Sequence, residues 1–215
     1  MNKQKTALIF LNGDPIGLPR VQKYLEKDAL LIGCDGGSRH ILHLGYQPDV
    51  VIGDFDSLMD SDKAMLHKDT AHVSHPADKD YTDGEAAIRY ALEHGCDEII
   101  LCSALGGRLD HLIGNVLLLY RREFRKATLK IIDDTQEAYV IRGHSVIHGK
   151  KGDTISFIPL TSSPQIIRSS GLRYDLSRYR LSRQGNTGIS NVMLRGTAEV
   201  VIASGSLLVI HQISS

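Results

Sequence analysis

Residues 51–57 have the sequence VIGDFDS, in which a short apolar run ends in two carboxylates, Asp54 and Asp56. If residues 49–52 form a parallel strand, both acids leave its carboxyl end, where open α/β sheets bind ligands. Two carboxylates held close together repel each other unless a proton or a cation lies between them, and Mg²⁺ bound with substrate phosphates relieves this repulsion. The stretch therefore predicts an acidic, metal-binding rim, with a polar turn or a helix cap as the alternative.

Apolar runs alternate with amphipathic stretches from residue 6 to residue 132. The expected strands are 6–11, 29–33, 49–52, 71–74, 98–102 and 127–132. The expected helices are 18–27, a stretch ending at residue 44, 60–67, 83–93 and 109–123. Strands that alternate with helices indicate βαβ units, so this part of the chain is predicted to be α/β, with a mainly parallel sheet and flanking helices.

The pattern changes near Asp133, after which no stripe with a helical period is found. Short, β-branched runs follow, punctuated by Gly, Ser and Pro, at 137–141, 146–147, 153–158, 165–168, 199–203 and 207–212. Such runs are typical of antiparallel strands in a sandwich or barrel. We expect an α/β domain over 1–134 and a smaller all-β sandwich over 135–215.

A second acidic cluster spans residues 78–85 and precedes the helix expected at 83–93. Thr82 and Glu85 have the spacing of a capping box, which accounts for half of the motif. Asp80 and Asp83 are not needed to start a helix. A helix amino terminus attracts anions, and acids crowded there need a cation as mediator if a phosphate is to come close.

A third cluster, residues 106–111, follows the strand at 98–102 and opens the next helix. Its paired glycines let the backbone approach a ligand, and Arg108 offers a planar fork suited to phosphate oxygens. On a helix, Arg108, His111 and Asn115 share one face. The other face is expected to lie in the core and carries Leu109, Ile113, Val116 and Tyr120.

A fourth cluster, Asp35-Gly36-Gly37, also follows an expected strand. The sequence contains neither a P-loop nor a G-x-G-x-x-G fingerprint, and neither Ser57 nor Ser103 has an assigned His partner as a nucleophile. Acids, an Arg and glycines without a nucleophile suit phosphoryl-type transfer, in which positioning and charge neutralisation supply most of the catalysis.

Composition limits the class of partner. Lys plus Arg and Asp plus Glu both number 25, so no net field attracts a nucleic acid or an anionic membrane surface. We therefore expect no nucleic-acid and no membrane partner, and no segment reaches membrane-spanning length. The three cysteines, Cys34, Cys96 and Cys102, have no C-x-x-C spacing. They indicate a reducing compartment, and we expect a cytoplasmic protein.

Taken in order, these motifs resemble those of the thiamine pyrophosphokinase family, and the resemblance covers nearly the whole chain. The first half carries Asp35-Gly36-Gly37, Gly53-Asp54-Phe55-Asp56-Ser57, Asp80-x-Thr82-Asp83 and Gly107-Arg108-Leu109-Asp110-His111. The second half carries Gly171-Leu172-Arg173-Tyr174 and Gly188-Ile189-Ser190-Asn191.

The resemblance implies transfer of the pyrophosphoryl group of ATP to the hydroxyl of thiamine, giving thiamine diphosphate and AMP. It also implies Mg²⁺, ATP as co-substrate, a catalytic domain over 1–134 that binds ATP and Mg²⁺, and a thiamine-binding and dimerisation domain over 135–215. The protein is then expected to be a homodimer with its active site at the subunit interface.

The resemblance further implies roles for individual residues. Asp54, Asp56 and Asp83 would hold Mg²⁺ against the ATP phosphates, with Asp54 and Asp83 also facing the substrate. Arg108 would bind phosphate, Asp110 would orient the reacting groups, and either Asp83 or Asp110 would accept the hydroxyl proton. Ser190 and Asn191 of the partner subunit would border thiamine. The remaining expected contacts to the nucleotide are Asp35, Gly36, Gly37, Asp80, Thr82, Gly107, His111 and Asn115.

This chain departs from the family's pattern in two ways. Val192 stands where many bacterial relatives carry an acid, and the chain has no Trp. The cationic ring of thiamine would then stack on Tyr174, Tyr179 or another ring. Two alternatives remain open at this level: a pyrophosphokinase acting on another hydroxymethyl heterocycle, such as a pterin, and a non-catalytic sensor of thiamine diphosphate or a nucleotide.

Overall fold

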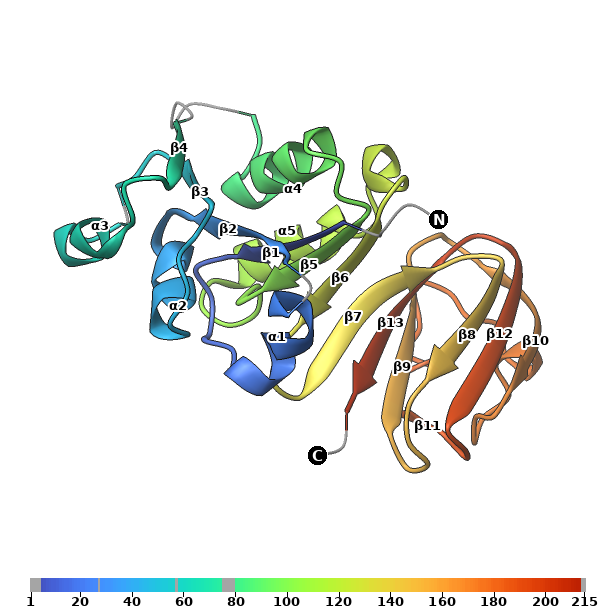
Figure 1. Ribbon diagram of the computed structural model, residues 1–215. Helices are drawn as coiled ribbons and strands as arrows, with labels where there is room; N and C mark the ends of the chain where they lie inside the picture. Colours follow the sequence, from blue (N-terminus) through green and yellow to red (C-terminus); the bar gives the residue numbers. More distant parts are fainter. Residues whose placement is uncertain (1–4, 27, 57, 75–79, 214–215) are drawn as a thin grey trace. The chain divides into compact units, whose positions relative to one another are not determined.

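A computed structural model describes residues 5–26, 28–56, 58–74 and 80–213 of the chain (Figure 1). The contacts divide it into two compact units, Met1–Asp134 and Thr135–Ser215, called here the amino-terminal and carboxyl-terminal units. Three residues of the acidic motifs, Ser57, Asp78 and Lys79, lie outside the described residues.

Six parallel strands form the sheet of the amino-terminal unit, in the order β6-β5-β1-β2-β3-β4. They are β1 (Thr6–Phe10), β2 (Leu30–Cys34), β3 (Val50–Gly53), β4 (Ala71–Ser74), β5 (Glu98–Cys102) and β6 (Thr128–Ile132). The helices are α1 (Leu18–Leu25), α2 (Ser38–His43), α3 (Asp60–Met65), α4 (Asp83–Glu93) and α5 (Leu109–Leu118). This arrangement confirms the predicted α/β class.

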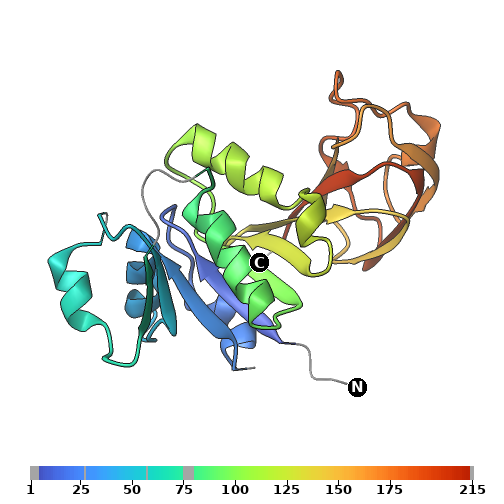
Figure 2. The same ribbon diagram turned by 90° about the horizontal axis from the view of Figure 1, so that it is seen from above.

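Helices cover both faces of this sheet, which explains why its central strands are apolar along their whole length. All five residues of β1 and all four of β3 are buried. In Figure 1, α4 lies over one face of the sheet and α1 and α2 lie under the other. Figure 2 shows α5, the yellow-green helix, beside α4 on the same side. A strand buried on both faces reads as a continuous hydrophobic run rather than as an alternating one.

The strand order reverses at β1, whose neighbours are β2 and β5. After β1 the chain enters α1, whereas after β5 it enters α5 on the opposite face of the sheet. The carboxyl ends of two such neighbouring strands flank the crevice in which open α/β sheets bind ligands. In this protein those ends carry the loops after Phe10 and Cys102, which are joined by bonds of 2.8 Å from the Gly13 and Asp14 amides to the Ser103 and Leu105 carbonyls.

Helix α5 is shorter than the predicted 109–123, because it ends at Leu118. The Tyr120 and Arg121 amides donate to the Leu117 and Leu118 carbonyls, which tightens the last turn. A short 3₁₀ helix, Arg122–Phe124, follows and places the Phe124 ring in the core. Burying this ring requires the chain to leave the path of the helix after Leu118.

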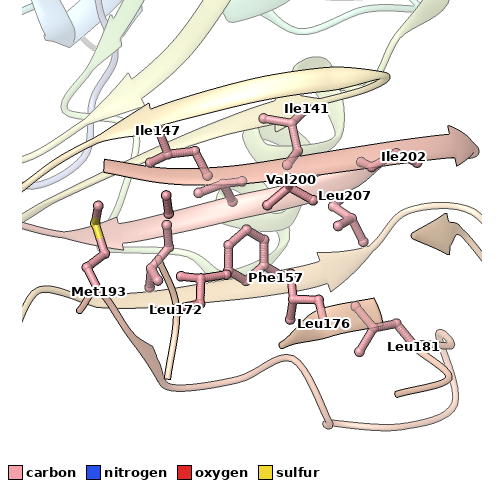
Figure 3. Packing of buried hydrophobic residues seen from close by; sticks show 13 residues of the cluster. Ile141, Ile147, Phe157, Leu172, Leu176, Leu181, Met193, Val200, Ile202 and Leu207 are labelled. Atoms are coloured by element: carbon pink, nitrogen blue, oxygen red, sulfur yellow. The ribbon is translucent and has the colours of Figure 1, made fainter. Parts of the chain in front are cut away.

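The carboxyl-terminal unit is a sandwich of antiparallel strands, as predicted. Strands β7 (Gln136–Ile141), β9 (Thr154–Pro159), β11 (Asn191–Val192) and β13 (Leu207–Gln212) pair in the order β11-β9-β13-β7. Strands β8 (His144–His148), β10 (Gln165–Ser170) and β12 (Thr197–Ser204) form a three-stranded sheet in the order β10-β12-β8. Figure 3 shows Phe157 and Leu207 of the first layer packed against Ile147, Val200 and Ile202 of the second.

Two further features of the carboxyl-terminal unit were not predicted, the strand β11 and a 3₁₀ helix at Leu176–Arg178. Both are too short to carry a periodic pattern. Along the described parts of the chain, no helix combines the length and the apolar character that crossing a membrane requires.

Candidate active site

Three carboxylates meet at the carboxyl edge of the parallel sheet. Asp35 follows β2, and Asp54 and Asp56 follow β3. One oxygen from each lies within 4.8 Å of the others. Asp35 is only 8% exposed, whereas Asp54 and Asp56 are open to solvent. The sequence placed Asp35 among the nucleotide contacts, but the structure brings its carboxylate into the acidic cluster itself.

Backbone geometry builds this cluster. Phe55 has a φ of 64°, a left-handed conformation that is rare for a bulky residue and often marks a functional turn. Its amide donates to Asp35 Oδ1 over 2.9 Å, and the Asp56 amide donates to Asp54 Oδ1 over 3.1 Å. Gly53 is required beside them, because a Cβ there would lie 1.9 Å from Asp35 Oδ1.

The Phe55 side chain does not belong to the buried core. Its ring is partly buried and lies 5.5 Å from the His72 ring of β4, centroid to centroid. The left-handed turn at Phe55 directs the neighbouring carboxylates, because the backbone hydrogen bonds to Asp35 and Asp54 fix it.

The electrostatics of the cluster suit a cation. The pKa of Asp35 is raised to about 6, mainly by burial and also by the charges of Asp83, Asp54 and Asp56, while the Phe55 N–H bond opposes this rise. The Asp56 amide lowers the pKa of Asp54, so that carboxylate remains ionised. Hard carboxylate oxygens of this kind are the ligands that Mg²⁺ prefers. The donor set therefore fits a magnesium ion.

Asp83 lies next to this cluster, at the first position of α4. Its charge acts on Asp35, and its carbonyl accepts a long bond of 3.6 Å from Cys34 Sγ. Asp83 does not belong to the group of carboxylates within 4.8 Å of one another, so it flanks the three acids. Asp80, three residues earlier, is exposed.

The predicted capping box forms only in part. Thr82 Oγ1 accepts the Glu85 amide over 3.3 Å and caps α4. The Glu85 carboxylate is instead engaged by the guanidinium groups of Arg89 and Arg121. Thr82 thus has a structural task in addition to the nucleotide contact expected of it.

Arg108 and Asp110 pair with each other at the amino terminus of α5. Arg108 Nε and Nη2 donate to the two Asp110 oxygens over 3.1 and 2.6 Å, and both side chains are exposed. The hydrogen bonds from Arg108 lower the pKa of Asp110 to about 2. A carboxylate with such a low pKa is a weak proton acceptor at neutral pH. Gly107 precedes the pair, and a Cβ added to it would meet open space.

The prediction for the two faces of α5 is wrong for Leu109, Ile113 and Asn115, and correct for Arg108 and His111, which are exposed. Leu109 and Ile113, expected in the core, are 70% and 49% exposed. Asn115 instead turns inward, and its Nδ2 donates to the Ala104 carbonyl over 2.9 Å. Leu118 is buried on the same side as Asn115. His111 is exposed, as an open site would require.

Sequence reasoning missed the loop after β1. Gly36 and Gly37 are expected to contact the nucleotide, and the structure gives Gly37 a further role, because a Cβ there would lie 2.2 Å from the Phe10 carbonyl oxygen of this loop. Asn12 lies on the other side of the contact, 3.1 Å from the position a Gly36 Cβ would take. Arg39 lies there as well. The available signal for this loop was Asn12-Gly13, a turn dipeptide that comes shortly after the end of β1.

In the carboxyl-terminal unit, Ser190 and Asn191 behave differently. Ser190 is exposed, has a φ of 57°, and its amide donates to Ser156 Oγ over 3.0 Å. Asn191 is 2% exposed, and its side chain bonds both the amide and the carbonyl of Tyr174, over 3.0 and 2.8 Å. The Asn191 amide therefore holds the Tyr174 backbone, and the Tyr174 ring is half exposed.

A pocket of about 320 Å³ adjoins the same segment, lined in part by Phe157, Pro159, Arg183, Gly188 and Ile189. Gly188 has no room for a side chain, because a Cβ there would lie 2.0 Å from the Phe157 carbonyl oxygen. The motif at 188–191 is therefore packed tightly onto β9 and leaves Ser190 at the surface.

Comparison with known proteins gives a consistent assignment. Residues 21–132 match the family described as "Thiamin pyrophosphokinase, catalytic domain", and residues 143–209 match "Thiamin pyrophosphokinase, vitamin B1 binding domain". The thiamine pyrophosphokinase of Bacillus subtilis is 29% identical over 211 residues, covering 96% of this chain and 98% of the relative.

Solved structures agree with these matches. The crystal structure of thiamine pyrophosphokinase from Bacillus subtilis superposes with a TM-score of 0.86 at 27% identity, covering 98% of this chain and 100% of that chain. The enzyme from Geobacillus thermodenitrificans gives a TM-score of 0.84 at 28% identity, covering 98% of each chain. With both domain descriptions matched and relatives aligned over nearly its full length, the chain belongs to the thiamine pyrophosphokinase family.

Proposed function

We propose that this chain transfers the pyrophosphoryl group of ATP to the hydroxyl of thiamine, giving thiamine diphosphate and AMP. The observation that carries the proposal is the acidic cluster of Asp35, Asp54 and Asp56 at the carboxyl edge of the sheet, in a chain of this family. The family names support a division of labour, with residues 1–134 binding ATP and residues 135–215 binding thiamine.

Mg²⁺ is the cofactor we propose, and Asp54, Asp56 and Asp83 are its ligands. Asp35 adds a fourth carboxylate that either binds the ion directly or accepts a hydrogen bond from its water. When bound, the ion would neutralise the phosphate charge that would otherwise repel these acids.

The reaction also requires a proton acceptor for the thiamine hydroxyl and a cation for the phosphates. Asp110 is disfavoured as the acceptor, because its bonds to Arg108 lower its pKa to about 2. We therefore assign proton acceptance to Asp83, beside the cluster, and an orienting role to Asp110. Arg108 is exposed at the amino terminus of α5. Its guanidinium can give up its bonds to Asp110 and bind a phosphate oxygen instead.

For thiamine, we propose that Ser190 of the partner subunit contacts the substrate directly. Asn191 of the partner subunit acts beside it by holding the Tyr174 backbone, which presents an exposed ring. Stacking on such a ring stabilises a flat cationic heterocycle, and no Trp is available in this chain.

We propose a homodimer in which the two subunits share each active site. Support comes from α5, where Leu109, Ile113 and Leu117 form an exposed apolar stripe beside Arg108. Patches of this kind mark protein interfaces.

Changing Ile113→Glu is expected to convert a dimer into monomers, because a charge would be buried in the stripe, and to lower activity in proportion. Sedimentation velocity measures the mass. Met65→Glu is the matched control, because Met65 is 56% exposed on α3 and lies outside the stripe. A wild-type chain that sediments as a monomer and remains active would contradict the shared site.

A cytoplasmic location is also proposed. Cys34, Cys96 and Cys102 are buried and form no disulfide within the described part of the chain, which suits a reducing compartment.

The proposed activity is tested by incubating the protein with ATP, Mg²⁺ and thiamine and following AMP. We expect AMP release that depends on thiamine, with a hydroxymethylpterin giving none. Release with the pterin alone would favour the pterin kinase, and tight binding of thiamine diphosphate without turnover would favour the sensor. The family assignment already favours thiamine over the pterin.

A further inference from the structure

We propose that Arg39 is a second phosphate-binding cation of the nucleotide site and that it holds the α-phosphate, the part of ATP that leaves as AMP. This inference rests on the proposed function. It adds a binding residue that the motifs did not contain.

The position of Arg39 is fixed by the turn that precedes it. Arg39 belongs to α2, and its Nε donates to the Gly36 carbonyl over 2.7 Å, so the guanidinium plane lies against the Asp35–Gly37 turn. A Cβ on Gly36 would lie 2.3 Å from Arg39 Nη2 and 3.1 Å from Asn12 Oδ1. Gly36 therefore leaves room for the guanidinium next to Asn12.

The charge of Arg39 is available to a ligand. Within the described part of the chain, no carboxylate forms an ion pair with Arg39, and only Nε has a hydrogen-bond partner. Arg108, by contrast, is paired with Asp110. An anion that binds Arg39 therefore displaces no internal ion pair. Arg39 is also partly buried, and a guanidinium shielded from water binds phosphate more strongly than a fully exposed one.

The guanidinium of Arg39 lies on the side of the Asp35–Gly37 turn that faces Asn12, after β1. The Asp35 side chain turns toward Gly53 and Phe55 after β3, whereas Gly36 turns toward Asn12 after β1. The Asp35–Gly37 turn thus has an acidic side, which faces the end of β3, and a cationic side, which faces the loop after β1. A phosphate chain that crosses this turn places its transferred end over the acids and its nucleoside end near Arg39.

The loop that completes this subsite is held firmly. Burial lowers the pKa of His40, so its ring is neutral, and Nε2 donates to the Gly13 carbonyl over 3.1 Å. The Gly13 amide donates to the Ser103 carbonyl over 2.8 Å. Asn12, one residue earlier, is therefore carried by anchored backbone and can turn its amide NH₂ toward an anion.

This placement assigns Arg39 a part in the reaction. The thiamine hydroxyl oxygen forms a bond to the β-phosphorus, its proton passes to Asp83, and the bond from the β-phosphorus to the α-phosphate oxygen breaks. The electron pair of that bond stays on the oxygen, which leaves as part of AMP. Arg39 next to the α-phosphate would stabilise the charge that develops there.

The test is the affinity for AMP itself, measured by isothermal titration calorimetry with wild-type protein, Arg39→Ala and Arg39→Lys. We expect Arg39→Ala to raise the Kd of AMP and the KM of ATP about 10- to 100-fold, since a charged hydrogen bond is lost. The KM of thiamine should change less than about twofold. Arg39→Lys keeps the charge without the planar fork, so its Kd for AMP should lie between those of the wild type and Arg39→Ala.

Arg125→Ala is the matched control, because Arg125 is exposed and precedes the start of β6, three strands away from β2, whereas Arg39 follows the end of β2. It removes the same charge and should leave AMP affinity unchanged. Thermal unfolding shows whether each variant folds. If Arg39→Ala does not fold, the AMP affinity of Arg39→Lys decides the outcome. Wild-type AMP affinity in a folded Arg39 variant, or no AMP binding by the wild type, would overturn the proposal. Loss of AMP affinity in a protein without thiamine-dependent turnover would instead refute the proposed function alone.

Discussion

Replacing Asp83 with Asn is expected to lower thiamine-dependent AMP formation at least about a hundred-fold while the protein stays folded. The Asn side chain has nearly the same shape, so the start of α4 should survive. It cannot carry the negative charge that Mg²⁺ needs, and it cannot accept the hydroxyl proton. The rate at saturating ATP and thiamine is the measurement, together with the free energy of unfolding in urea.

Asp60→Asn is the control for this variant. Asp60 is the first residue of α3, as Asp83 is the first residue of α4, so both substitutions remove an acid from a helix amino terminus. Each should cost less than about 1 kcal/mol of stability. Only Asp83→Asn should affect turnover. Activity retained by Asp83→Asn would show that the catalytic assignment is wrong.

Glu85→Gln is expected to cost about 2 to 3 kcal/mol of unfolding free energy, which is a large share of the stability of a small domain. The Glu85 side chain is only 7% exposed and carries bonds from Arg89 and Arg121. Neutralising it leaves two guanidinium groups facing an amide. Both arginines are partly exposed, at 43% and 42%, so water would compensate for some of the loss. Urea unfolding followed by circular dichroism measures the change.

Glu123→Gln tests whether burial, rather than ion pairing alone, sets the contribution of Glu85 to the unfolding free energy. Glu123 bonds the same two arginines, over 2.9 and 3.0 Å, but its side chain is 41% exposed. Exposed ion pairs contribute little, so this change should cost less than about 1 kcal/mol. Equal losses for the two variants would mean that burial of Glu85 does not set its contribution. Glu85→Gln should also lower activity in proportion to unfolding, since α4 carries Asp83.

Much of the fold could be predicted because its local signals agree with its tertiary structure. The range 83–93 for α4 and the range 98–102 for β5 match the structure residue for residue. The first has a clear helical period and the second is a continuous apolar run, and both have turn residues at their ends. Asp54 and Asp56 were recognisable for a similar reason, because acids placed directly after an apolar strand have no use in its packing.

The remaining errors come from contacts between segments distant in sequence. The periodicity of α5 revealed two faces, but only the bond from Asn115 to Ala104 decides which one packs inward. Asp35 looked like part of a glycine turn, and its place among the acids depends on the Phe55 amide, 20 residues away. Nothing near Asn191 in the sequence reveals that its side chain bonds the backbone of Tyr174. Patterns within one segment cannot supply such partners.

The central claim is that one pyrophosphoryl group moves intact, and product analysis by ³¹P NMR tests it most directly. Wild-type protein incubated with ATP, Mg²⁺ and thiamine should give thiamine diphosphate and AMP in equal amounts, with no ADP. Formation of ADP with thiamine monophosphate, or of AMP without thiamine diphosphate, would contradict the account.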